Sequence, residues 1–134
     1  MLVLSDPALT TRIADPVIRA LVERRYLEIL DGEAYDYDRH GTMIVVEVGD
    51  SVEALEKQAG FPILKNYFDE ARYPDPDFIP TCEALEEHDG CYEMLFITND
   101  EGFAITLWIP KAEGIDASLL AMCAQFATPA VNHQ

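Results

Sequence analysis

The chain has 134 residues, of which 49% are hydrophobic, and 25 acidic residues against 9 basic ones give a net charge of −16 at pH 7. This length and composition suit one compact domain over residues 1–134 and argue against disorder. The negative charge disfavours direct binding to nucleic acid or anionic membranes and favours a basic protein partner, although it can also serve solubility alone.

The first residues, MLVLSDP, lack a basic region, and their apolar run is too short for a signal peptide. No stretch approaches the ~18 apolar residues of a membrane span. The three cysteines, Cys82, Cys91 and Cys123, are an odd number. We therefore expect reduced thiols, a cytoplasmic location and no membrane partner.

Capping signals predict two helices in the first half of the chain. Asp15 can cap the first helix, which begins at Pro16 and ends before Gly32. Residues 50–53 resemble a capping box and open a second, short helix that ends at Gly60.

Residues 42–48, TMIVVEV, form a β-branched run that predicts a strand. The overlapping segment 36–47 nearly fits a calcium-binding loop, but an imidazole stands where an oxygen ligand is needed and a strand follows where a helix is required. We therefore predict a polar turn without a metal ion. Asp36, Asp38, Gly41 and Glu47 occupy positions that fit the loop, and His40 is the imidazole at the position that does not.

The middle of the chain is rich in proline and acidic residues. Pro62 is expected to begin a short helix, and residues 73–80, YPDPDFIP, predict an extended connector, because each proline disfavours a helical conformation of the residue before it. The acids of this connector could meet a cation or a basic surface, but a solvated loop is the simpler interpretation.

Residues 82–109 predict three antiparallel strands joined by two hairpin loops, at residues 88–90 and 99–102. Pairing Glu87 with Cys91, and Thr98 with Phe103, gives one continuous and mostly apolar side. The residues expected on that side are Cys82, Ala84, Glu86, Tyr92, Met94, Phe96, Ile105, Leu107 and Ile109.

The stretch His88-Asp89-Gly90-Cys91 could indicate a Cys–His nucleophilic pair, or a zinc site together with Cys82. A hairpin tip offers no oxyanion hole and no exclusion of water, and the spacing lacks the short paired intervals of structural zinc sites. We therefore predict a turn with His88 and Asp89 at its tip, and no catalytic or metal-ligating residues.

The opposite side of the same three strands is half apolar with an acidic rim. Either a helix or the N-terminal segment covers it, or it is a binding surface anchored by an aromatic residue. Replacing Trp108 by Ala separates these interpretations: loss of binding with the fold intact favours the surface, and loss of the fold favours a cover. The candidate binding residues are Trp108, Leu95, Ile97, Glu83, Glu87 and Glu93.

These predictions combine into a single α+β domain. We expect an antiparallel sheet of three or four strands, from residues 43–48 and 82–109, with helices, including residues 116–127, mainly on one face. Common nucleotide-binding and hydrolase motifs are absent from the sequence, and no pair of carboxylates is singled out for acid–base catalysis, so we expect no cofactor.

The function favoured by the sequence is a small acidic protein-binding module without catalytic activity. It would act as an inhibitor, an immunity-type protein or a regulatory adaptor that recognises a basic surface, with mimicry of nucleic-acid charge as a sharper version. The alternative is a small-ligand-binding protein or enzyme with a pocket between the sheet and residues 50–70. A homodimer formed through the mixed sheet face is a third possibility.

Overall fold

The computed structural model describes residues 1–31, 42–60, 63, 81–98 and 103–129. The predicted turn at residues 36–41, the helix expected after Pro62 and the connector 73–80 lie outside these residues. Within these described residues, three α-helices and one 3₁₀ helix accompany the strands. In chain order the elements are β1 (Leu2–Leu4), η1 (Pro7–Arg12), α1 (Pro16–Asp31), β2 (Met43–Val45), α2 (Val52–Ala59), β3 (Thr81–His88), β4 (Cys91–Thr98), β5 (Phe103–Pro110), α3 (Ala117–Phe126) and β6 (Thr128–Pro129).

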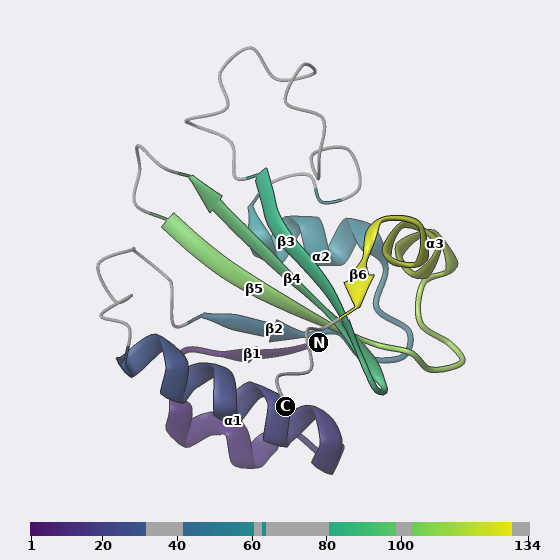
Figure 1. The fold of residues 1–134 in the computed structure, drawn as a ribbon. Coiled ribbons are helices and arrows are strands. Elements are labelled where there is room, and N and C mark those ends of the chain that lie inside the picture. Colours follow the sequence, from purple (N-terminus) through teal and green to yellow (C-terminus); the bar gives the residue numbers. More distant parts are fainter. Residues whose placement is uncertain (32–41, 61–62, 64–80, 99–102, 130–134) are drawn as a thin grey trace.

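The strands form one six-stranded mixed sheet in the order β1-β2-β5-β4-β3-β6 (Figure 1). The predicted α+β class and the antiparallel β3-β4-β5 meander are confirmed. The expected number of strands and a wholly antiparallel sheet are not, because β2 pairs parallel with β5 and β6 pairs parallel with β3. β1 and β6 have three and two residues, which is too short for an alternating pattern to reveal them.

Side-chain caps begin the helices where the sequence predicts them. Asp15 Oδ1 accepts a hydrogen bond from the backbone N–H of Val17 at 2.8 Å, and Ser51 Oγ accepts one from Ala54 at 3.1 Å. Asp116 caps α3 in the same way. These bonds satisfy N–H groups that have no partner inside the helix, so local sequence is enough to place the helix starts.

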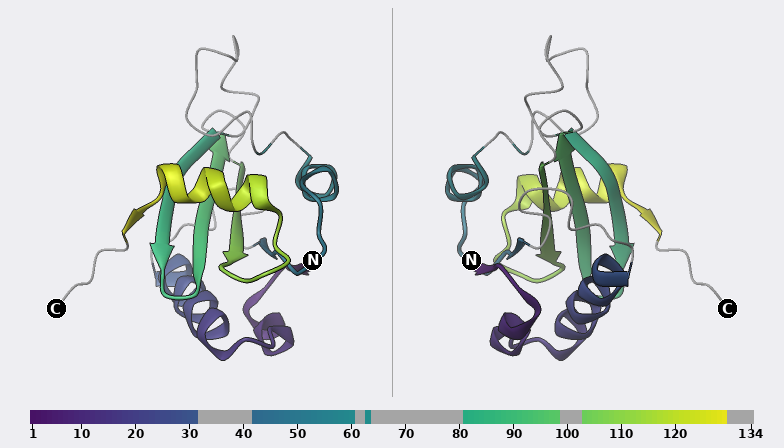
Figure 2. Two further views of the ribbon diagram at one scale, coloured as in Figure 1. Left: turned by 90° about the vertical axis from the view of Figure 1, so that its right-hand side faces the viewer. Right: turned by 90° about the vertical axis from the view of Figure 1, so that its left-hand side faces the viewer.

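Helices cover both faces of the sheet (Figure 2). α2 and α3 pack over the face that carries Met94, Phe96 and Leu107, and α1 and η1 pack over the face that carries Met43 and Trp108. The expectation that helices lie mainly on one face is therefore wrong. Most side chains of the central strands are apolar on both faces, so each face needs a cover that removes it from water. No helix among the described residues is long and apolar enough to cross a bilayer.

The register of the first hairpin differs from the predicted one by a single residue. His88 pairs with Cys91 across a two-residue Asp89-Gly90 turn, whereas Thr98 pairs with Phe103 as predicted. Asp-Gly is a favoured pair for such short turns. Side chains alternate along a strand, so this shift exchanges the faces of the residues at the end of β3. Leu85 faces the core under α3, and Glu86 faces α1. An irregularity between Cys82 and Ala84 returns Cys82 to the α3 face.

The burial of Trp108 gives the first testable prediction. Trp108 is 1% exposed and its indole N–H donates to Met43 Sδ at 3.2 Å. Trp108→Ala should lower the free energy of unfolding by about 3–5 kcal/mol, because it leaves a large cavity beneath α1. Denaturant unfolding measures this loss, with the exposed Leu27→Ala as the control, expected to change stability by less than about 0.5 kcal/mol. Equal stabilities of the two variants would contradict the burial.

Candidate functional site

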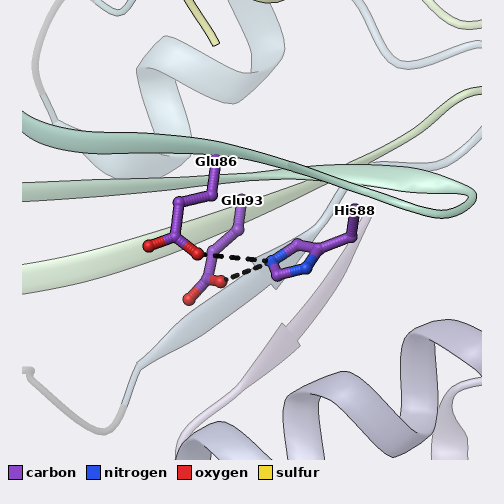
Figure 3. A group of neighbouring side chains, drawn as sticks. All are labelled: Glu86, His88 and Glu93. Atoms are coloured by element: carbon purple, nitrogen blue, oxygen red, sulfur yellow. Dashed lines mark hydrogen bonds and ion pairs between the residues drawn. The ribbon is translucent and has the colours of Figure 1, made fainter. Parts of the chain in front are cut away.

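Charged and polar side chains gather between α1 and the β3-β4 hairpin. Glu86 and Glu93 are cross-strand partners, and His88 lies two residues beyond Glu86 on the same face of β3. Figure 3 shows both carboxylates pointing toward one nitrogen of the imidazole. Arg25 of α1 joins them from above the sheet. We call these four residues, with Glu28 on the next turn of α1, the hairpin cluster.

Arg25 donates two hydrogen bonds to the carboxylate of Glu93. Its Nε lies 2.6 Å from Oε2 and its Nη2 lies 2.8 Å from Oε1, a two-pronged geometry that orients both groups. The Glu93 side chain is only 8% exposed, so its charge would be costly without a partner. Arg25 also contacts Glu28, and it lies 3.8 Å from Glu86. The pair therefore fastens α1 to the centre of the sheet.

His88 is a half-buried residue of this cluster, and its side chain is 8% exposed. Its Nε2 lies 2.9 Å from Glu93 Oε1 and 3.8 Å from Glu86 Oε2, and its ring stacks on Trp108 with the centroids 6.0 Å apart. Because a carboxylate only accepts, Nε2 donates the hydrogen bond to Glu93. The expectation that His88 sits at a hairpin tip is wrong: β3 continues through His88, and only Asp89 and Gly90 form the turn.

The electrostatics of the cluster keep Glu93 ionised. Burial alone raises its pKa, but the hydrogen bonds from His88 and Arg25 and the positive charge of Arg25 together lower the pKa below its ordinary value. Three carboxylates, of Glu28, Glu86 and Glu93, face one guanidinium. The three carboxylates outnumber Arg25 and His88 together, so the cluster has an excess of negative charge in either protonation state of the imidazole.

The structure separates the cysteines that the sequence places near His88. Cys91 lies under α1 on the same face as the cluster, and burial raises the pKa of its thiol to about 12. Cys82 lies on the opposite face, in the core under α2 and α3. A protonated Cys91 thiol does not supply the thiolate that a nucleophile needs, and Cys82, His88 and Cys91 do not converge on one point.

The six candidate binding residues do not form one exposed surface. α1 covers Trp108, so the expected aromatic anchor is a core residue, and Glu93 is held in the hairpin cluster. Leu95 is half-buried on the same face. Glu87 lies on the opposite face, where it pairs with Lys111 Nζ at 2.8 Å. The side chains of Glu83 and Ile97 lie outside the described residues, and whether any of the six contacts a partner remains a prediction.

A hollow of about 560 Å³ lies on the outer side of α1, far from the pocket expected between the sheet and residues 50–70. It is shallow and mostly apolar. α1 therefore has an inner face that closes the core and an outer face with a depression in it. The residues that line this hollow are Pro16, Val17, Ala20, Leu21 and Arg24.

The hairpin cluster was not predicted from the sequence, because the expected register put Glu86 and Glu93 on opposite faces of the sheet. Two features of the sequence could have predicted the cluster. Side chains alternate along a strand, so Glu86 and His88 share a face, and a two-residue turn after His88 pairs Glu86 with Glu93. Comparison with known proteins gives no further assignment: no protein-family model, no curated protein and no solved structure matches the chain.

The lowered pKa of Glu93 predicts how its contribution to stability depends on pH. A carboxyl group whose pKa falls on folding adds stability above its unfolded pKa of about 4.3, and this stability is lost as the pH falls through the folded pKa. Glu93→Gln should therefore destabilise the protein by about 1–3 kcal/mol at neutral pH and by less at acidic pH. Denaturant unfolding across this pH range tests it, with the exposed Glu87→Gln as the matched control. A pH-independent difference for Glu93→Gln would contradict the assignment.

All three cysteines are buried, which predicts slow thiol chemistry. In the native protein at about pH 8, a thiol reagent should label none of them at the rate of an exposed cysteine, and all three should react after unfolding in guanidinium chloride. Mass spectrometry of the labelled chain identifies each site. Rapid labelling of Cys91 in the native state would show that its thiol is accessible and ionised.

Proposed function

We propose that the protein is a non-catalytic binding module that contacts a partner protein with the outer face of α1. Five residues at helical spacing lie along this face, and we call them the α1 stripe: Val17, Ala20, Leu21, Arg24 and Leu27. Val17 is 50% and Leu27 66% exposed, and the hollow lies along the stripe. Ala20 is also exposed, and Leu21 is half-buried at the edge of the core. These exposed apolar side chains beside a depression are the observation that carries the proposal.

The α1 stripe has the composition of an interface. Single exposed apolar residues are ordinary on a protein surface, but a row of them on one helix face, with a hollow for a partner's side chain, is typical of recognition sites. Arg24 lies within the row, is exposed, and has no ion pair with any residue that the structure describes. Arginine is enriched where interfaces concentrate their binding energy.

The net charge of −16 supports a partner that is basic overall. Attraction between opposite charges speeds the encounter of two proteins, and this attraction weakens as the salt concentration rises. Buried apolar side chains then stabilise the complex. An inhibitor, an immunity-type protein or a regulatory adaptor of the cytoplasm would work in this way. The proposed binding surface therefore differs from the one expected around Trp108: it lies on the outer side of α1, the helix that covers Trp108.

A capture experiment with the tagged full chain tests this function. In cell lysate at low salt, the chain should retain a basic protein that high salt releases, and Val17→Asp with Leu27→Asp should reduce capture by about tenfold or more. Val48→Asp is the matched control, because Val48 is also 66% exposed but lies after β2.

Equal capture by wild type and the α1 double variant would contradict this surface. Recovery of the bait alone at both salt concentrations would contradict a protein partner. It would turn attention to a small ligand in the hollow, or to self-association measured by analytical ultracentrifugation.

A further inference from the structure

Two negative charges stand directly opposite each other in the β3-β4 hairpin. Glu86 and Glu93 are cross-strand partners on one face, an arrangement that destabilises a sheet unless a cation lies nearby. Arg25 hydrogen-bonds both oxygens of Glu93 but stays 3.8 Å from Glu86, beyond hydrogen-bonding distance. The charge of Glu86 is therefore only partly compensated by the described residues around it.

We propose that Glu86, His88 and Glu93 bind a divalent transition-metal ion of the zinc class. One oxygen of each carboxylate and Nε2 of His88 would be the ligands, with the imidazole proton moved from Nε2 to Nδ1, and these three atoms lie within 4.8 Å of one another (Figure 3). This site is separate from the α1 stripe, and its existence does not depend on the proposed protein partner.

The distances between the ligand atoms suit such an ion after a small adjustment. Metal–ligand bonds of about 2.0–2.2 Å in a tetrahedral site put neighbouring ligand atoms about 3.4 Å apart. His88 Nε2 lies 2.9 Å from Glu93 Oε1 and 3.8 Å from Glu86 Oε2, values on either side of that separation. The Glu86 side chain is 38% exposed, so it has room to rotate and the ion has a path from solvent.

The ligand types select the class of ion. Imidazole nitrogen suits zinc and its neighbours in the transition series, whereas calcium and magnesium prefer all-oxygen sites. The excess negative charge of the hairpin cluster favours a dication. The stacking of His88 on Trp108 already fixes the orientation of the ring, which lowers the entropy lost on binding.

Arg25 does not have to leave when the ion binds. It can keep the 2.6 Å bond from its Nε to Glu93 Oε2 and its contact with Glu28, while Glu93 Oε1 turns to the metal. Arg25 then orients a ligand carboxylate from behind, as hydrogen-bonding partners of metal ligands commonly do. Water would complete the coordination at the exposed side.

Titration calorimetry of the untagged full chain with zinc chloride tests the site, together with the visible spectrum of the cobalt-loaded protein. We expect one strongly bound ion per chain, and an affinity weakened by about tenfold or more in both His88→Gln and Glu86→Gln. Glu87→Gln is the matched control, since Glu87 is the next residue but lies on the opposite face. A second control, His40→Gln with His133→Gln, removes the other two histidines and should leave the affinity unchanged.

Glu86→Gln keeps the test valid if His88→Gln loosens the packing on Trp108, because Glu86 is partly exposed and its loss relieves a repulsion. Circular dichroism and melting without zinc verify that each variant is folded. The zinc-induced change in the nitrogen-15 shift of His88 Nε2 reports the ligand directly. Full affinity in a folded Glu86→Gln variant, loss of binding in the His40/His133 control, or no binding to wild type would each overturn the proposal.

Discussion

The ion pair between Arg25 and Glu93 is the constraint on which the α1 side of the structure depends. Glu93 lies on the α1 face of the sheet between the apolar side chains of Cys91 and Trp108 and the polar members of the hairpin cluster. A carboxylate there is tolerable only with a hydrogen-bonded cation, and the cation comes from α1. The helix that covers Trp108 is therefore the helix that neutralises Glu93, so packing and electrostatics specify the same position for α1.

This constraint also divides α1 into an inner and an outer face. Ile18, Val22 and Tyr26 close the core on the inner side, and Arg25 reaches sideways into the hairpin cluster. These contacts hold the helix in place, and Val17 and Leu27 on its outer side remain exposed without a part in the core. The charged cluster and the exposed stripe are thus two consequences of one helix placement.

Local features of the fold could be predicted from the sequence, and non-local ones could not. Asp15, Ser51 and Asp116 cap their helices through bonds that span two or three residues, so the sequence alone identifies them. The parallel pairing of β2 with β5 joins segments about sixty residues apart, and no local pattern encodes it. The predicted β3-β4 register was wrong for a more local reason: the turn has two residues, Asp89 and Gly90, and not the three that were assumed. This one-residue difference in register reverses the face on which Glu86 and His88 lie, so the predicted register did not bring the hairpin cluster together.

A double-mutant cycle on Arg25 and Glu93 tests the central claim most directly. The free energy of unfolding would be measured for wild type, Arg25→Met, Glu93→Gln and the double variant under one set of conditions. If the pair fastens α1 to the sheet, the two changes should be non-additive, with a coupling energy of about 1–3 kcal/mol. Additive effects, with a coupling near zero, would show that α1 is held by apolar packing alone and that the ion pair does not organise this face.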